Sequence, residues 1–351
     1  MRRFLLAATG ALLALSACDN TLDITAPWKE TPVLFALLDP TQDTNYVRIG
    51  RAYLGDEGPA GGAMHPDSLY YPSLEVRVQA LGPNGNVLAT YTLPEAPEVS
   101  LNSNGPFATQ GYKAYRLVAT LNEAYTYRIQ AFKPESTTPL LTATTPLVKP
   151  STWVLREPSP LGGALVRIPI GSKNGAKFRW DQAENARIYQ GYLRFRWVEV
   201  AEDGALADSV RYSVDYPLPT LLGNNLQGND EVSTAVGYAD FYDFLATSSA
   251  LPVKPGVLRF FRGIDLYLTA GSDDLATYIS VSQPSNSIVQ DKPFFSNVNG
   301  GAGVFASRAQ YARPNLSISN NSLDSLIMSR KTCKLRFAKV TTVDTTTHIC
   351  Q

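Results

Sequence analysis

The chain has 351 residues and a formal net charge of zero, with 31 basic and 31 acidic residues. Because only 18% of the residues are charged, the composition does not favour binding to nucleic acid or to an anionic membrane surface. The 18 Tyr and 14 Phe against three Met, with many Thr and Val, favour strands over helices, and the length is sufficient for two domains.

The N-terminus has the features of a lipoprotein export signal. Two arginines precede an apolar run at residues 4–15, which ends in the lipobox Leu-Ser-Ala-Cys with Cys18 as its cysteine. Such a run is too short to span a bilayer and is typical of a cleaved signal. We expect residues 1–17 to be the signal peptide, the thiol of Cys18 to carry a membrane-anchoring lipid, and residues 18–30 to be a tether. The alternative is an ordinary secretory signal followed by a free cysteine.

The first half of the body predicts a β-sandwich of immunoglobulin-like size at residues 31–148, which ends in a Pro-rich stretch. Its clearest signal is an Asn-Gly turn at residues 84–85 between two alternating segments, because Asn-Gly readily takes the positive φ angles of a hairpin turn. The predicted strands are residues 32–38, 46–52, 74–81, 87–93, 112–121 and 125–131.

The second half, residues 151–351, predicts a β-rich domain with short helices. Two further turns, Asn-Gly at 174–175 and Asp-Gly at 203–204, separate apolar segments. Leu193, Phe195 and Trp197 alternate with polar residues and should share one face. The spacing of Trp180 and Tyr189 is similar to the B and C strands of a fibronectin-like sandwich, where the Trp packs in the core. Strands are expected at residues 165–170, 176–180, 192–200 and 205–214.

Beyond residue 237 the apolar spacing changes to that of helices. Residues 238–245 predict a short helix, residues 258–268 a central strand, and Ser272-Asp273-Asp274 the start of another helix. The Gly-rich residues 297–303 predict a loop. The fold class is therefore mainly β, with immunoglobulin/fibronectin-like β-sandwich domains and a few short helices in the C-terminal half.

The C-terminus predicts a final strand pair at residues 334–343 and 345–350, stapled by a disulfide between Cys333 and Cys350. Export would place both thiols in an oxidising compartment, where such a pair tends to bridge. A closed loop of this size stabilises by roughly 3 kcal/mol in the chain-entropy model. The alternative is two unpaired thiols.

One long segment carries a family resemblance. Residues 267–308 read YLTAGSDDLATYISVSQPSNSIVQDKPFFSNVNGGAGVFASR, and the first predicted strand reads TPVLFALLDP. With the lipobox, these features resemble the Bacteroidetes lipoproteins grouped as domain-of-unknown-function family 4249, whereas the insertion at residues 55–66 departs from that pattern. The positions that match the family's Gly-rich ending are Pro293, Ser296, Asn297, Val298, Gly300, Gly301, Gly303, Val304 and Phe305. The resemblance implies a cell-envelope lipoprotein without established activity, found beside TonB-dependent outer-membrane transporters, and supplies no catalytic residues.

No residue pattern predicts catalysis or a metal site. The two histidines, His65 and His348, lie in no recognisable triad or zinc motif. The carboxylate pairs Asp240 with Asp243 and Asp273 with Asp274 could in principle act on glycosides, but a solvated helix face and a helix start explain them better. The acidic loop at residues 55–58 and the pair Asp39 and Asp43 lack an ordered calcium pattern and are better explained as solvated turns. We expect no enzyme, no cofactor and no metal.

Four aromatic residues beside prolines are the candidate interface residues: Tyr70, Tyr71, Phe294 and Phe295. Most aromatic residues in strands belong to the core, but these lie in predicted loops, where exposed rings can contact a partner. Three Asp-Ser-apolar triplets, at residues 67–69, 208–210 and 324–326, fit the short O-glycosylation pattern of Bacteroidetes export.

The sequence thus predicts a non-enzymatic envelope lipoprotein that acts as a protein-interaction module, beside a TonB-dependent transporter. The alternative is a surface lipoprotein that binds a carbohydrate or another ligand directly. We expect attachment to the outer membrane through Cys18, with the body exposed at the cell surface; the periplasmic face is the alternative location.

Overall fold

The computed structural model describes residues 30–52, 65–100, 109–159, 165–168, 175–204, 206–283 and 294–339. Several sequence predictions lie outside these residues: the signal peptide, Cys18 and most of the tether, the acidic loop at 55–58, Pro293, His348, Cys350 and the last predicted strand. No helix among the described residues is long and apolar enough to cross a bilayer.

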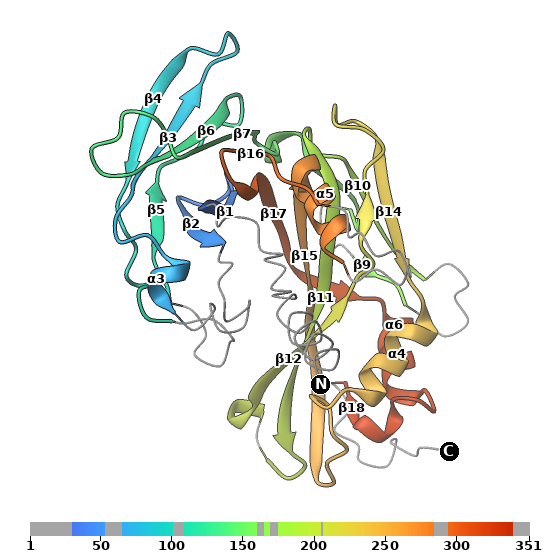
Figure 1. The fold of residues 1–351 in the computed structure, drawn as a ribbon. Helices are drawn as coiled ribbons and strands as arrows, with labels where there is room; N and C mark the ends of the chain where they lie inside the picture. The colour runs from blue at the N-terminus through green and yellow to red at the C-terminus, as the bar shows by residue number, and fades with distance from the viewer. Residues whose placement is uncertain are drawn as a thin grey trace, which may run out of the picture.

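One ten-stranded sheet extends through the molecule and contributes to two sandwiches (Figure 1). Its main path is β12-β11-β15-β17-β1-β2-β5, and β13, β18 and β9 pair with β11, β15 and β17. The strands are β1 (Thr31–Leu38), β2 (Thr44–Ala52), β5 (Ala114–Val118), β9 (Leu165–Val166), β11 (Ala186–Ala201), β12 (Val210–Pro217), β13 (Leu221–Leu222), β15 (Val257–Ser272), β17 (Ala302–Ile318) and β18 (Phe337–Ala338).

Two smaller sheets complete the sandwiches. A five-stranded sheet packs on the β1-β2-β5 end: β16 (Val298–Asn299), β7 (Leu141–Pro146), β6 (Thr126–Phe132), β3 (Glu75–Leu81) and β4 (Val87–Leu93). A three-stranded sheet packs on β11, β15 and β17: β14 (Glu231–Val236), β10 (Ala176–Asp181) and β8 (Val154–Glu157). Each pair of sheets encloses its own hydrophobic core, so the predicted class of mainly β sandwiches is confirmed.

Strand β17 belongs to both sandwiches. Its first part, from Ala302 to Ser307, pairs in parallel with β1, and its second part, from Arg308 to Leu316, pairs antiparallel with β15. The short strand β16 just before it pairs with β7. The N-terminal sandwich therefore includes residues 298–307, which the predicted boundaries assigned to the second domain. Alternation within a strand identifies its buried face but not its neighbour, so the sequence could not reveal this pairing.

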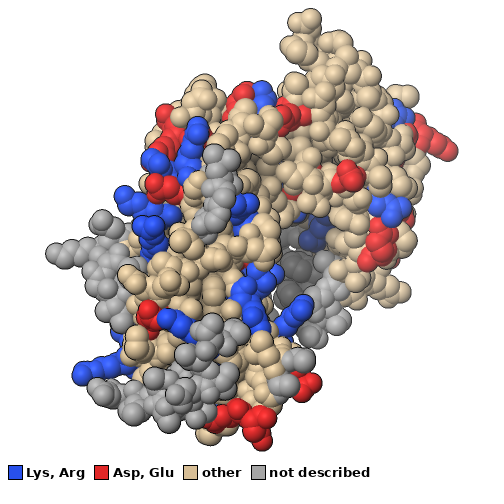
Figure 2. Space-filling model, turned by 180° about the vertical axis from the view of Figure 1, so that it is seen from behind, with Lys and Arg blue, Asp and Glu red and all other residues tan. Residues whose placement is uncertain are grey.

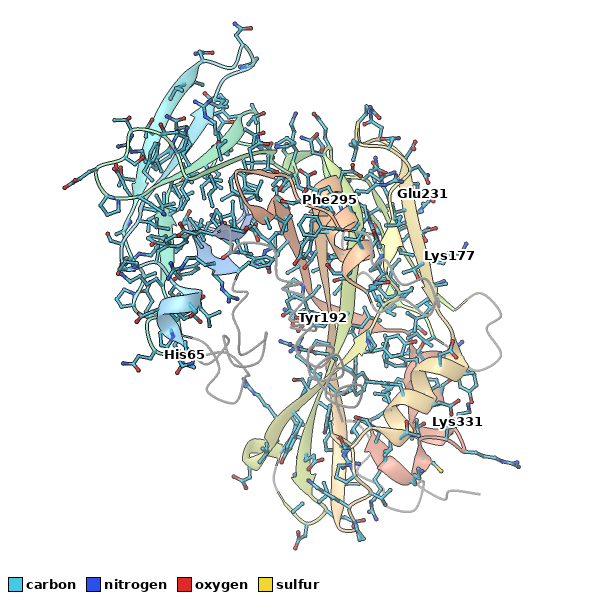
Figure 3. All side chains as sticks on the ribbon, in the orientation of Figure 1. His65, Lys177, Tyr192, Glu231, Phe295 and Lys331 are labelled. Atoms are coloured by element: carbon cyan, nitrogen blue, oxygen red, sulfur yellow. The ribbon has the colours of Figure 1, made fainter. Side chains whose placement is uncertain are left out.

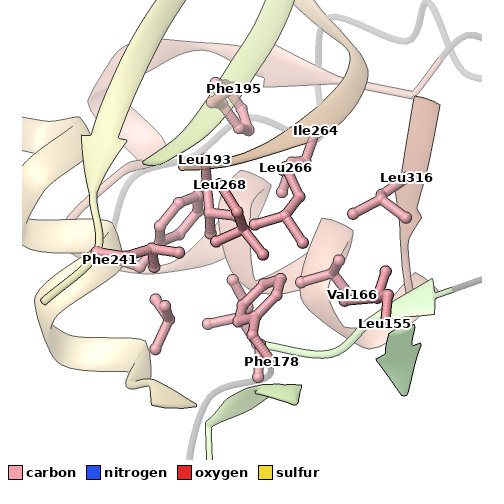
Figure 4. Close-up of a cluster of buried hydrophobic side chains, with 14 of the residues drawn as sticks. Leu155, Val166, Phe178, Leu193, Phe195, Phe241, Ile264, Leu266, Leu268 and Leu316 are labelled. Atoms are coloured by element: carbon pink, nitrogen blue, oxygen red, sulfur yellow. The ribbon is translucent and has the colours of Figure 1, made fainter. Parts of the chain in front are cut away.

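The core of the second sandwich confirms the predicted faces of β10 and β11. Leu193, Phe195 and Trp197 are at most 1% exposed, and Phe195 and Leu193 lie among side chains from several strands (Figure 4). The rings of Trp180 and Tyr189 lie 5.7 Å apart, and β10 and β11 belong to different sheets, as in the fibronectin-like pattern. Each fully buried large apolar side chain stabilises the fold by about 1.5–3 kcal/mol.

Four α-helices are described: α3 (Pro66–Leu69), α4 (Tyr238–Thr247), α5 (Asp273–Ser282) and α6 (Asn320–Met328). Helices α4 and α5 confirm the predicted ones. Helix α6 was missed, although Ser319 is its N-cap and accepts a hydrogen bond from the Ser322 amide at 3.2 Å. Short 3₁₀ helices occupy η1 (Pro150–Thr152), η2 (Leu206–Asp208) and η3 (Cys333–Leu335).

The strand predicted over residues 334–343 is confirmed only at Phe337–Ala338 and is wrong for the described residues before them. The chain instead forms η3, turns at Arg336 with a φ of 60°, and then adds the two-residue β18 parallel to β15. The Arg259 guanidinium holds this path, because its Nη1 donates to the Leu335 carbonyl at 2.8 Å. Cys333 is disulfide-bonded. Its pairing with Cys350 stays a prediction, since Cys350 lies outside the described residues.

Candidate functional site

An open groove of about 420 Å³ lies between α5 and the face of β1 and β2 that points away from the first core. Leu34, Ala36 and Leu38 are buried in that core, so alternation directs Phe35 and Leu37 to the opposite face. Helix α5 covers this face only in part. The groove therefore has an apolar wall on both sides, formed by Phe35, Leu37 and Tyr46 from the sheet and Leu275, Tyr278 and Ile279 from the helix.

The two walls meet at an aromatic contact. The rings of Phe35 and Tyr278 lie 5.9 Å apart at an interplanar angle of 74°, an edge-to-face geometry that favours a fixed orientation. Tyr46, in contrast, is 42% exposed at the rim. The contact sets the floor of the groove, while the exposed ring remains able to bury area against a ligand or partner.

The polar end of the groove is built around Asp39, which is only 1% exposed. Its carboxylate accepts hydrogen bonds from the Thr41 amide at 3.0 Å and from Gln310 Nε2 at 2.9 Å, and lies 3.4 Å from Arg308 Nε. Asn45 Oδ1 accepts from the Asp39 amide at 2.7 Å. The interpretation of Asp39 as part of a solvated turn is therefore wrong, because its carboxylate is buried and these donors satisfy it.

The segment that carries the family resemblance builds the helix wall of the groove. The Asn297 side chain joins the two ends of this segment: its Nδ2 donates to Asp274 at 2.8 Å and to the Phe305 carbonyl at 2.8 Å. Its Oδ1 accepts from the Phe305 amide at 2.9 Å. Burial raises the pKa of Asp274, which begins α5, above its usual value. Asn297 thus holds the start of α5 against the start of β17.

The glycines of the same segment have a steric role. A Cβ on Gly303 would lie 2.0 Å from the Leu34 carbonyl oxygen, and one on Gly301 would lie 2.5 Å from the Pro32 carbonyl oxygen. Gly303 also has a φ of +108°, which side chains rarely adopt. These glycines let β17 lie against β1, in agreement with their interpretation as structural. The predicted loop at 297–303 is shorter than expected, because Val298–Asn299 and residues from Ala302 onward are strands.

The predicted interface aromatics divide into two groups. Tyr70 and Tyr71 are only 5% and 4% exposed, so the prediction that they present rings to a partner is wrong. Tyr70 packs edge-on against Tyr112, Arg51 lies over the Tyr71 ring, and burial raises the pKa of both hydroxyls. Phe294 is 78% exposed, whereas Phe295 is half-buried beside α5 (Figure 3). Only the Phe294 ring is freely available.

The carboxylate pairs occupy structural positions. Asp243 forms an ion pair with Lys331, Asp273 lies 3.8 Å from Arg187 Nε, and Asp274 binds Asn297. The exposed His65 precedes α3. Among the described residues, no group of three or more His, Cys, Asp or Glu side chains is placed to hold a metal ion.

Sequence reasoning considered Asp39 and Val304 for other reasons but did not predict the groove, although one signal was present. The first strand, TPVLFALL, is apolar on both faces, and such a run is typical of a strand that is covered on both sides. The described structure covers one face of β1 with a sheet and the other only partly with α5. The unfilled part of that second face is the groove.

No protein-family model and no curated protein matches the chain. Similar solved structures include the C-terminal globular domain of an oligosaccharyltransferase from Pyrococcus abyssi, with 11% identity and a TM-score of 0.24 over 70% of this chain and 49% of that one. Trypsin-activated α2-macroglobulin from Escherichia coli has 14% identity and a TM-score of 0.17, over 70% of this chain and 14% of its own. The chicken CNTN1 FN1–FN3 domains have 9% identity and a TM-score of 0.19, and the match covers 84% of this chain and 69% of that one. The chain spans about half of the first structure, and likeness at this level carries no inference about activity.

Proposed function

We propose that this chain is a cell-envelope lipoprotein of the family it resembles, anchored through Cys18, and that it is a non-enzymatic interaction module beside a TonB-dependent transporter. The groove between α5 and β1–β2 receives an apolar segment of the partner. The observation that carries this proposal is the position of the family-like segment, which supplies Leu275, Tyr278, Ile279 and Val304 to one open apolar groove.

The chemistry of the groove favours binding over catalysis. Its one described carboxylate, Asp39, is buried and accepts hydrogen bonds from Gln310 and the Thr41 amide, which favours a structural role for it. The exposed ring of Tyr46 and the aliphatic side chains of α5 can bury apolar area without bond making or breaking. Aromatic anchors in such positions contribute the largest share of binding energy at protein interfaces.

A second candidate function is direct binding of a small ligand. The groove volume of about 420 Å³ lies within the roughly 300–1,000 Å³ common for small-molecule sites. An apolar or sugar-like ligand that stacks on Tyr46 would then replace the protein segment. Both functions use the same groove. A partner protein would co-purify with the chain under the first function, and a small ligand would be bound under the second.

Affinity purification of the tagged full chain from outer membranes tests the leading proposal. The variant Tyr46→Ser with Ile279→Ser removes apolar groups from both walls, and Leu88→Ser with Val87→Ser is the matched control on exposed β4. We expect a transporter to co-purify with the wild type and the control, and to be lost from the groove variant. Glycan-array binding that depends on the groove, with no co-purified protein, would support the second function instead.

The anchor is tested separately. The variant Cys18→Ser should remain unprocessed and should carry no lipid. In a separate test, protease added to intact cells should digest the wild-type body if the body faces the outside. A Cys18→Ser chain that is still processed and still labelled by palmitate would contradict the proposed anchor. Digestion only after lysis would place the body at the periplasmic face.

A further inference from the structure

Basic side chains are unevenly distributed over the surface. Seen from behind, Lys and Arg gather along the border of a hollow (Figure 2). One group of three arginines, from three adjacent strands of the large sheet, lines a pocket of about 290 Å³: Arg196 of β11, Arg211 of β12 and Arg262 of β15. The other described lining residues are Trp197, Val198 and Tyr212, so none of the described residues that line this pocket carries a carboxylate.

Two of the three guanidinium groups have no counter-charge among the described residues. The Arg211 and Arg262 side chains are exposed, and neither guanidinium group makes a hydrogen bond or an ion pair with a described residue. Strand pairing holds these two arginines near one another. Val198 of the central strand β11 pairs with Arg211 of β12 on one side and with Phe260 of β15 on the other, and Arg262 follows Phe260 by two residues. The pocket therefore concentrates positive charge that the described residues do not neutralise.

The third guanidinium is held in a fixed position. Arg196 Nη2 donates to Asp265 Oδ1 at 2.9 Å and to Asn315 Oδ1 at 2.6 Å. Asp265 is itself only 6% exposed and also accepts from the Asn315 amide at 2.8 Å. Such support orients an arginine before any ligand arrives and lowers the cost of ordering it on binding.

The backbone near Arg196 is shaped to make room for this side chain. The β11–β15 pairing shifts register between Arg196 and Trp197. Opposite that bulge, Gly263 has a φ of +135°, and a Cβ there would lie 2.8 Å from Arg196 Nη2. Asn315 has a φ of 60°, in the left-handed region. Three local features thus converge on the placement of one guanidinium group.

We propose that this pocket binds a phosphoryl group, either in a lipid headgroup or in a free phosphorylated compound. A phosphoryl group offers several oxygens to guanidinium forks from different directions, and each charge-assisted bond is stronger than a neutral one. Arg196 provides the fixed contact, and Arg211 and Arg262 close on the anion from the neighbouring strands. The pocket is separate from the groove of the proposed function, so this inference does not depend on it.

Calorimetric titration of the purified full chain in a neutral detergent tests the proposal with two probes. Inorganic phosphate represents the free anion, and short-chain phosphatidylglycerol, compared with short-chain phosphatidylcholine, represents the lipid headgroup. We expect saturable binding of at least one anionic probe. Tighter binding of phosphatidylglycerol than of phosphate would identify a lipid source, and the reverse order would identify a free phosphorylated compound.

The variant Arg211→Gln with Arg262→Gln should weaken the Kd of the bound probe at least tenfold. Arg156→Gln with Arg330→Gln removes the same charge from exposed positions outside the pocket and should change it less than twofold. Arg211→Lys with Arg262→Lys keeps the charge but loses the fork, and should give an intermediate Kd. Absence of saturable binding by both anionic probes, or equal weakening in the pocket and control variants, would overturn the proposal.

Discussion

A methyl group at residue 303 has no room, because a Cβ there would lie 2.0 Å from the Leu34 carbonyl oxygen and 2.9 Å from its carbonyl carbon. Both atoms belong to the backbone of β1, so a side-chain rotation cannot relieve the contact. Gly303→Ala must therefore displace β17 from β1, at the place where the parallel pair joins the two sandwiches.

The expected cost has two parts. Alanine at a φ of +108° adds roughly 1–3 kcal/mol of backbone strain. Separation of the strands weakens the pairing near Gly303, and each lost hydrogen bond costs about 0.5–1.5 kcal/mol. With two pairing hydrogen bonds lost, Gly303→Ala should therefore lower the free energy of unfolding by about 2–6 kcal/mol.

Urea unfolding followed by Trp fluorescence measures this change. Gly256→Ala is the matched control, since Gly256 has a φ of +73° but no heavy atom within 4 Å of its Cβ position. The control should cost only the strain, about 1–3 kcal/mol. Equal destabilisation by the two variants would refute the steric explanation of the glycine pattern.

Three further predictions concern buried polar groups. Burial raises the folded pKa of Asp274, so the wild type loses stability as this carboxyl ionises between pH 3 and pH 7. The variant Asp274→Asn cannot ionise there, so its stability relative to the wild type should rise with pH. Urea unfolding midpoints of both proteins at several pH values measure this difference. Arg259→Met should lower the free energy of unfolding by about 3–5 kcal/mol, because it leaves the buried Glu199 carboxylate without its partner at 2.9 Å. Thermal or urea unfolding measures this change, and a change near zero would show that Lys254 alone neutralises Glu199. Tyr242→Phe should cost about 1–2 kcal/mol, because its hydroxyl lies 2.9 Å from the Ile168 carbonyl and 2.8 Å from that of Ser322, and an unchanged unfolding midpoint would contradict this.

Local patterns predicted most individual elements. The alternation of Leu193, Phe195 and Trp197 identified the buried face of β11, and the apolar spacing beyond residue 237 identified α4. Predictions failed where a distant contact controls the chain. The segment from Cys333 to Leu335 forms η3, where Arg259 binds the Leu335 carbonyl, although the local sequence favours a strand; only Phe337–Ala338 forms one, beside β15. Tyr70 and Tyr71 lie beside a proline, yet tertiary packing buries both rings.

The candidate site shows the same division. The sequence singled out the segment from Tyr267 to Arg308 as distinctive, and its glycines as backbone requirements. It did not indicate that this segment lies against β1, nor that Phe35 and Tyr46 form the opposite wall of a groove. The arginine pocket arises similarly, because Arg196, Arg211 and Arg262 are brought together only by the pairing of three strands.

By itself, the amino-acid sequence determined the strand-rich class, the buried faces of the strands and the positions of the turns, because side-chain alternation and turn chemistry act between near neighbours in the chain. The tertiary structure alone decided which strands are adjacent. Sharing β17 between two sandwiches depends on packing between segments that are far apart in the sequence, and both the groove and the arginine pocket are consequences of that packing.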